Sequence, residues 1–210
     1  MEKTHQNQSN EKIAIKPEFE KGMGLIVVIL VLAFLLTVGI VLVTITSTGS
    51  KVTGNIRWQE QAFNAAEAGF DSAYLAIEDF FAGASWTSFD GHYLIDPAGI
   101  DIPLDDYYFR KKTDAEVLDL LDPTGDGYPD YDNVIFYKTP YIPDGAGGYD
   151  TRYTYTVFLI DDERGGGSPD PGDALLICIG AVQLADTVIT SRVEVELDIE
   201  LPGTKKKLSI

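Results

Sequence analysis

The feature that most constrains this chain is an uninterrupted apolar stretch near its beginning. Residues 22–50 contain no charged side chain, and their apolar core, from Met23 to Val43, is 21 residues long. A helix of that length rises about 30 Å, the thickness of the hydrocarbon layer of a bilayer. A single segment in lipid must satisfy its own backbone hydrogen bonds, and a helix does so. The sequence therefore predicts a membrane-spanning helix over residues 23–50.

The next segment, residues 51–82, is polar but keeps a helical period. Its apolar residues recur at intervals of three, four and seven, which is typical of one face of an amphipathic helix; they are Ile56, Phe63, Ala66, Phe70, Ala73, Ile77 and Phe81. No proline lies between Gly22 and Ala82, so both segments can form one continuous helix. We expect the apolar stripe of its second half to pack against the domain that follows.

Negative charge is concentrated in the remainder of the chain. The formal net charge is −17, and residues 1–22 carry four Lys and four Glu, so the excess lies after Ser50, with 12 Lys or Arg against 29 Asp or Glu. Such a domain repels nucleic acid and anionic lipid headgroups and attracts cations. Nucleic acid is therefore excluded as a partner.

Residues 83–210 are expected to form one acidic, β-rich outer domain. Residues 83–105 are rich in turn signals, and residues 114–121 can form one or two helical turns. Strands are predicted over 133–138, 152–161, 174–184 and 187–201. The last alternates apolar residues with carboxylates, so its carboxylate face is expected to be solvated. The predicted fold class is α+β, in which one long N-terminal helix packs by its second half against a single antiparallel sheet of three or four strands.

Catalytic motifs are absent from the sequence. Cys178 lies in an apolar run and is expected to be a small buried core residue, and one cysteine excludes an internal disulfide. His5 and His92 stand alone, which argues against a histidine metal site or a His-based triad. No phosphate loop, nucleophile elbow, zinc-protease motif or dinucleotide fingerprint occurs. The sequence predicts that the protein is not an enzyme.

The best candidate for specific chemistry is the acidic segment 122–133. Compared with the twelve-residue calcium loop, it places oxygen ligands at the first, third, fifth, seventh and ninth positions; these are Asp122, Thr124, Asp126, the Tyr128 carbonyl and Asp130. Gly127 takes the sharp turn, while Asn133 stands in place of the bidentate glutamate and Asp132 could replace it. The alternatives are a structural calcium ion and a turn with solvated acids.

The leader, residues 1–22, allows two interpretations. It is polar, ends in Lys21–Gly22, and lacks the short apolar region and small-residue cleavage site of a secretory signal. It could be the tail of an uncleaved anchor, or it could be removed between Gly22 and Met23. The second interpretation resembles the class III signal of type IV pilins and pseudopilins, in which a prepilin peptidase cleaves after the glycine and methylates the new amino terminus. The fifth mature residue is Val27, where most of that family has glutamate.

A second motif refines the resemblance. Gly54, Asn55 and Arg57 precede Ala-Phe-Asn-Ala-Ala-Glu-Ala-Gly at 62–69, and this block resembles the N-terminal signature of PilX-type minor pilins, which also lack the glutamate. The resemblance covers about residues 21–74. It implies a pilin-like form of the α+β fold predicted above and a minor pilin that acts at the tip or in the priming of a type IV pilus. The helix would pack among other subunits, and the residues implied in that packing are Met23, Val27, Phe34, Gly39 and Glu67.

The resemblance also implies location and partners. The chain would be held in lipid of the inner membrane as a single-pass protein with its outer domain in the periplasm, and then enter an extracellular filament. Its partners would be other pilins, the pilus assembly platform and the prepilin peptidase. The alternatives are a pseudopilin of a type II secretion system and an uncleaved membrane anchor that displays a calcium-binding module.

Overall fold

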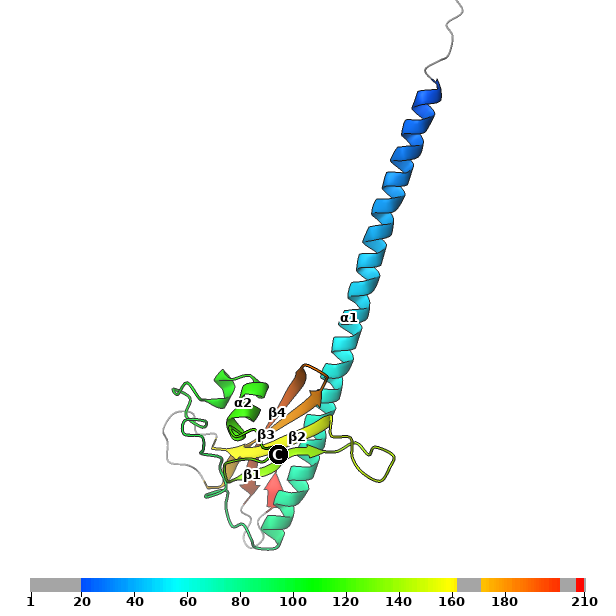
Figure 1. Cartoon of the computed structure of the whole chain (residues 1–210). Coiled ribbons are helices and arrows are strands. Elements are labelled where there is room, and N and C mark those ends of the chain that lie inside the picture. The colour runs from blue at the N-terminus through cyan, green and yellow to red at the C-terminus, as the bar shows by residue number, and fades with distance from the viewer. Residues whose placement is uncertain (1–19, 162–170, 201–206, 210) are drawn as a thin grey trace, which may run out of the picture. The chain divides into compact units, whose positions relative to one another are not determined.

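The computed structural model describes residues 20–161, 171–200 and 207–209 of the chain (Figure 1). Residues 1–19, most of the predicted leader, lie outside the described residues. The chain divides into two compact units, of which the first ends at Val52 and the second, here called the globular unit, begins at Thr53. Helix α1, Glu20–Ala82, contributes to both.

In the first unit, α1 is apolar around its whole circumference. Every residue from Met23 to Thr46 is exposed, and this span of 24 residues is long and apolar enough to cross a membrane. The hydroxyls of Thr37, Thr44 and Thr46 donate to carbonyl oxygens four residues earlier, at 2.8–2.9 Å. These bonds satisfy hydroxyls that would otherwise lack partners in lipid. The segment is therefore suited to single-pass membrane anchoring.

The globular unit is built on one antiparallel meander. Its strands lie in sequence order across the sheet; they are β1 (Val134–Pro140), β2 (Tyr153–Ile160), β3 (Asp173–Gln183), β4 (Val188–Glu200) and β5 (Lys207–Ser209). The first four confirm the predicted strands to within a few residues at each end. The sequence did not predict β5, which has three residues and pairs with the end of β4.

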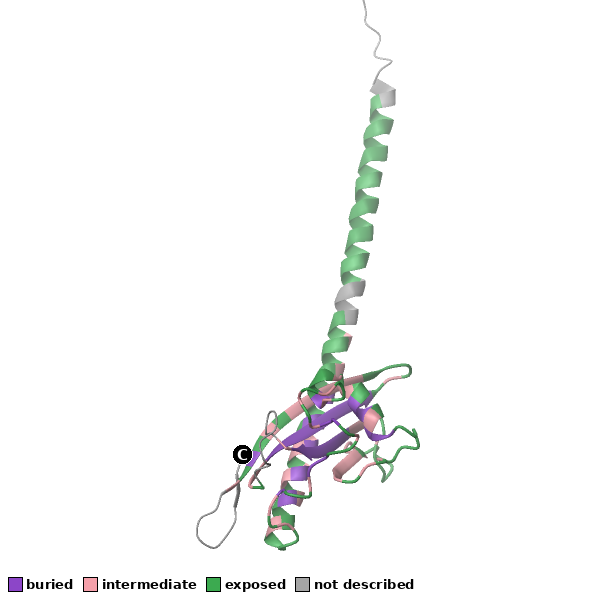
Figure 2. Cartoon of the chain, turned by 90° about the vertical axis from the view of Figure 1, so that its left-hand side faces the viewer, coloured by how far each residue is buried: buried purple, intermediate pink, exposed green. Residues whose placement is uncertain are grey.

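One face of the sheet packs against the later part of α1. Ala66, Ala73 and Ile77 of the helix are fully buried, and they form one cluster with alternate residues of the strands; these include Tyr155, Val157, Leu159, Leu176, Cys178 and Leu197. Figure 2 shows these buried strands in purple inside the globular unit. The predicted α+β arrangement, a long helix against an antiparallel sheet, is confirmed.

The other face of β2 and β3 is also covered, which the prediction of a single helix layer did not include. A second core cluster joins this face to α2 (Asp114–Leu121) and to the segment before it, which contains the short 3₁₀ helix η1 (Phe109–Lys111); its buried members include Leu94, Ile100, Phe109, Val117, Phe158, Ile177 and Ile179. Further along the same face, Glu194 and Glu196 of β4 are paired with Ile177 and Leu175 of this cluster. Glu194, Glu196 and Asp198 are exposed, as predicted for the carboxylate face of this strand, and the side chain of Glu200 lies outside the described residues. The globular unit therefore has three layers where β2 and β3 lie.

Specific polar contacts fix α2 on this second face. Thr113 caps the helix, because its hydroxyl accepts from the Glu116 amide while the Glu116 carboxylate accepts from the Thr113 amide. Arg192 of β4 donates from Nε to the Asp114 carboxylate at 2.6 Å. Arg110 forms an ion pair with Glu194, also at 2.6 Å. Both pairs join the connecting segment and α2 to β4.

Strand β1 lies at one edge of the sheet and is irregular. Its register against β2 shifts between Val134 and Phe136 and again between Phe136 and Thr139. Lys138 has a positive φ of 41°, which is rare for a residue other than glycine. The strand is therefore bulged where Tyr137 and Lys138 lie.

A close approach between α1 and β3 yields the first prediction. A Cβ added at Gly180 would overlap the carbonyl oxygen of Ala62 and the amide nitrogen of Ala66, and would lie 2.9 Å from the Ala65 Cβ. Gly180→Ala is therefore expected to lower the free energy of unfolding of the globular unit by about 2–3 kcal/mol. Urea unfolding of the full chain in detergent, followed by tryptophan fluorescence, measures this change.

The matched control is Gly54→Ala on α1. A Cβ at Gly54 meets nothing within 4 Å, and alanine favours a helix over glycine by up to about 1 kcal/mol. The control should be as stable as the wild type or slightly more stable. Equal stabilities for Gly180→Ala and the wild type would contradict the close packing of helix and sheet.

Candidate functional site: the apolar helix and the Asp122 loop

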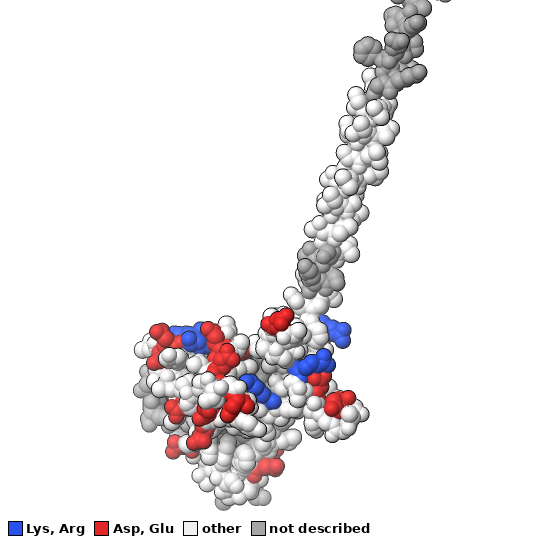
Figure 3. All heavy atoms as spheres, in the orientation of Figure 1, with Lys and Arg blue, Asp and Glu red and all other residues white. Residues whose placement is uncertain are grey.

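The predicted processing and packing residues lie at and after the start of α1. The Gly22–Met23 bond falls in the first turn of the helix, which begins at Glu20. Met23, Val27 and Phe34 are 65%, 56% and 65% exposed, and at about 100° per residue they share one face. Gly39 lies on a different face, and a Cβ added there would meet nothing within 4 Å. This part of α1 presents only uncharged side chains, whereas carboxylates gather on the globular unit (Figure 3).

The alanine-rich block at 62–69 has a packing role within this fold. Ala62, Ala65, Ala66 and Gly69 are buried, and their small size lets the helix backbone approach β2 and β3. Glu67 points away from the sheet, because it is exposed, and it makes no hydrogen bond or ion pair with any residue that the structure describes. In this block the Glu67 carboxylate therefore faces outward, while the small residues form a surface that is buried against the sheet.

The apolar stripe of α1 extends beyond the part that the sheet covers. The expectation that Ile56 and Phe63 pack against the following domain is wrong, since they are 59% and 43% exposed. Together with Gln59, Glu60, Thr190 and Ser191 they line a shallow groove of about 520 Å³ between α1 and β4. The stripe leaves the sheet here because β3 and β4 end at the turn 184–187. An apolar surface in the globular unit is thus left uncovered.

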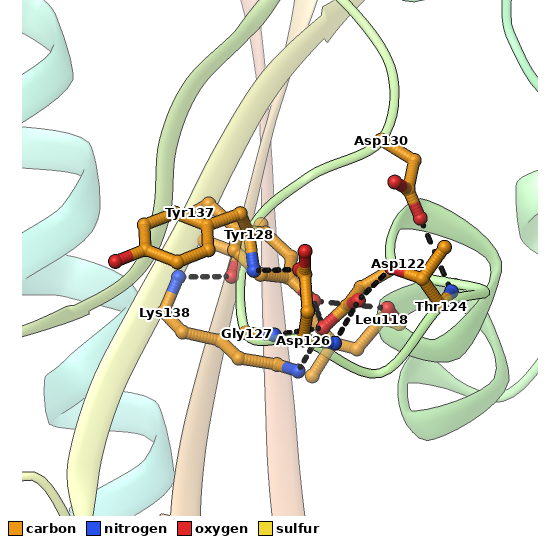
Figure 4. Close-up of polar contacts among 10 residues, drawn as sticks. Leu118, Asp122, Thr124, Asp126, Gly127, Tyr128, Asp130, Tyr137 and Lys138 are labelled. Carbon is orange, nitrogen blue, oxygen red and sulfur yellow. Dashed lines mark hydrogen bonds and ion pairs between the residues drawn. The ribbon is translucent and has the colours of Figure 1, made fainter.

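The second candidate site is the loop that follows α2. Asp122 is the C-cap of that helix and is buried, with 6% of its surface exposed. Its carboxylate accepts from the amides of Asp126 and Gly127 and from the Tyr137 hydroxyl, each at 3.1 Å. The Lys138 ammonium lies 3.3 Å from the same carboxylate (Figure 4). One buried anion thus organises the loop and connects it to β1.

These contacts shift the pKa values of Asp122 and Tyr137. Burial opposes ionisation of Asp122, but the hydrogen bonds from Tyr137, Lys138 and Gly127 outweigh it and lower the pKa of the carboxyl. Burial, followed by the hydrogen bond to Asp122 and nearby carboxylates, raises the pKa of the Tyr137 hydroxyl above its ordinary value. The charged carboxylate and the neutral phenol are therefore the forms that the fold favours.

The remaining predicted ligands are used within the loop. The Thr124 amide donates to the Asp130 carboxylate at 3.1 Å, and the Tyr128 amide donates to Asp126 at 2.9 Å. Asp132 is exposed. No three carboxylates, histidines or cysteines of the described residues are grouped as they would be around a metal ion. Calcium at this loop stays a prediction, and the loop would have to release Lys138 from Asp122 to bind the ion.

Tyr137 and Lys138 were not predicted as members of this site. Neighbouring residues of a regular strand point to opposite faces of the sheet, so a strand pattern alone would not place both beside Asp122. The register shift between Phe136 and Thr139 makes this possible. The sequence contains no glycine or proline within 134–139 that would have indicated the bulge.

The single cysteine and His92 are placed away from any such site. Cys178 is fully buried in the core between α1 and the sheet, as predicted, and burial raises the pKa of its thiol to about 12. The His92 ring stacks on Trp86 with ring centres 3.9 Å apart. Neither residue is part of a catalytic arrangement among the described residues.

Acid should weaken the contacts of Asp122. Because the pKa of Asp122 is lowered in the folded state, its contribution to stability is present above about pH 4, the ordinary carboxyl pKa, and is lost as the pH falls through the folded value. Asp122→Asn should therefore lower the urea midpoint at pH 7, and the difference from the wild type should shrink at about pH 3. Asp132→Asn is the control; an equal effect of both substitutions at pH 7 would contradict the role of Asp122.

Calcium and Lys138 should compete for Asp122. Lys138→Met removes the ammonium and keeps the aliphatic chain, so it is expected to tighten calcium binding by about tenfold. Calorimetric titration of calcium into the full chain compares the variant with the wild type, and Asp126→Ala tests the loop. If neither the wild type nor Lys138→Met binds calcium, the calcium prediction is wrong.

Comparison with known proteins gives no match: no family model, curated protein or solved structure matches this chain. What the chain does has to be inferred from its own residues.

Proposed function

We propose that this protein is a minor pilin, a structural subunit that joins a type IV pilus through α1. The observation that carries the proposal is the uncharged helix surface from Met23 to Thr46, exposed on every side, directly after a leader that ends in Lys21–Gly22. A helix of this kind can exchange lipid for the helices of other subunits, since both surroundings are apolar. The driving force is then close packing between helices.

Val27 favours a position at the tip or in the priming complex. Cleavage after Gly22 leaves a charged amino group on Met23, and an unpaired charge among apolar helices costs several kcal/mol. Val27 lies one helical turn away, on the same face as Met23, and has no carboxylate to offer a neighbouring amino group. A subunit of this kind suits a single position at the end of a filament better than repetition along the shaft.

The globular unit offers surfaces for neighbouring subunits. Ile56 and Phe63 continue the apolar stripe of α1 beyond the sheet and remain exposed, and Glu67 extends outward without a partner among the described residues. These residues lie on the same helix that would enter the filament core. In this proposal the protein is inserted in the inner membrane with the globular unit in the periplasm before assembly.

The proposal predicts processing at Gly22. Co-expression with a prepilin peptidase should yield a mature chain that begins at Met23 and carries one methyl group on its amino terminus, as measured by intact mass spectrometry. Gly22→Val, which changes the residue before the cut, should leave the leader attached in nearly all molecules, whereas the control Gly24→Ala should be cleaved. A chain that keeps residue 1 in the presence of active peptidase contradicts the proposal.

A type II secretion pseudopilin would be processed in the same way, so a second measurement separates the two. Deletion of the gene in its own host should reduce the number of pili while export of secreted enzymes continues unchanged. Loss of enzyme export with normal pili would assign the protein to the secretion system instead.

A further inference from the structure

A half-enclosed cavity in the globular unit has no role in the assembly proposed above. It has a volume of about 430 Å³ and lies between α2 and the end of the sheet next to the turn that joins β3 and β4. The residues that line it are Ala115, Leu118, Asp119, Lys138, Thr151, Thr154, Ala181, Gln183 and Val188. A concave site with an apolar floor and a few polar groups is the usual form of a ligand pocket.

The cavity exists because side chains become smaller along this face of the sheet. Phe158 and Ile179 fill the space under α2 and the segment before it. Further along the same face of the two strands stand Thr154 and Ala181, which are paired in the register of β2 and β3. The eight-residue helix α2 continues above these small residues, so the space between them is left unfilled.

The polar groups that line the cavity have unused capacity for hydrogen bonds. Within the part of the chain that the structure describes, the hydroxyls of Thr151 and Thr154 and the carboxylate of Asp119 make no hydrogen bond. Gln183 donates from its amide nitrogen to the Leu184 carbonyl at 2.8 Å, which leaves its amide oxygen as an acceptor. Most of these groups are oxygens that can accept from a donor-rich ligand.

The charge of the cavity favours a cation. Lys138 is the one basic side chain among the lining residues, and its ammonium is already bound, 3.3 Å from Asp122 and 4.8 Å from the centre of the Tyr137 ring. An anionic ligand would gain no free positive charge there and would meet Asp119. The net charge of −17 also favours a cationic ligand over an anionic one.

We propose that this cavity binds a primary ammonium group carried on a short aliphatic chain. The ammonium would pair with Asp119 and donate to the threonine hydroxyls and the Gln183 amide oxygen. The methylene groups would lie on the apolar floor formed by Leu118, Ala181 and Val188. Two sources supply this chemistry, the lysine side chain of a partner polypeptide and a free linear polyamine.

The test is binding to the full chain in nanodiscs, measured by calorimetry with Nα-acetyl-lysine methylamide. Saturable binding is expected, and the norleucine analogue, which has a similar chain without the amine, should bind at least about tenfold more weakly. Asp119→Asn should weaken binding of the lysine probe at least about fivefold. Asp106→Asn, which removes another exposed carboxylate outside the cavity, should leave the affinity unchanged.

Two further variants test the cavity itself. Ala181→Leu should abolish binding by filling the floor, and Thr154→Val should weaken it while it preserves the shape of the strand. Tighter binding of the lysine probe than of 1,4-diaminobutane would assign the site to a polypeptide, and the reverse order would assign it to a polyamine. Equal affinities for the lysine and norleucine probes, equal effects of Asp119→Asn and Asp106→Asn, or no binding of either amine would overturn the proposal.

Discussion

The globular unit depends on how closely the backbone of α1 approaches strand β3. Gly180 faces the helix where a side chain would overlap the backbone of Ala62 and Ala66. Small residues on both elements allow this approach, because few side-chain atoms lie between the backbone of α1 and the backbone of β3. Gly69 repeats the arrangement one strand further, since a Cβ there would lie 3.0 Å from the Cβ of Tyr155. The whole alanine-rich surface of the helix is matched to the sheet in this way.

This packing gives a physical reason for the sequence block on which the resemblance to PilX-type pilins rests. Four of its residues, Ala62, Ala65, Ala66 and Gly69, are buried because the sheet lies against them. Glu67 and Phe63 of the same block are exposed, so they are not part of the surface that the sheet buries. A single short motif thus has one side buried against the sheet and one side exposed.

Much of the fold could be predicted from periodicity. The alternation in residues 193–200 predicted a strand with one solvated face, and Glu196 and Asp198 lie on that face of β4. The apolar run of 174–182 is different, because it is buried on both faces as β3. An apolar run without alternation indicates that both faces of the strand are covered. Nothing in the sequence of residues 94–112, however, indicated that these residues would cover the second face. Leu94, Ile100 and Phe109 are separated by turns, so they follow no helical or strand period.

In the candidate sites, contacts between residues that are close in sequence could be predicted, whereas contacts between different elements could not. The spacing of acids in 122–130 correctly placed Asp122, Asp126 and Asp130 in one loop, since loop residues are close in sequence. The contact between Asp122 and Lys138 joins two elements and depends on an irregular strand, which composition does not reveal. The cavity beside α2 arises from small residues on neighbouring strands and could be found only once their register was known.

The irregular edge of the sheet has a consequence for association between copies of the domain. An open β edge presents unpaired amides and carbonyls to which another strand can add. In β1 the two register shifts and the left-handed backbone of Lys138 interrupt the row of amides and carbonyls that another strand would need. The β1 edge is thereby a poor template for pairing with another strand.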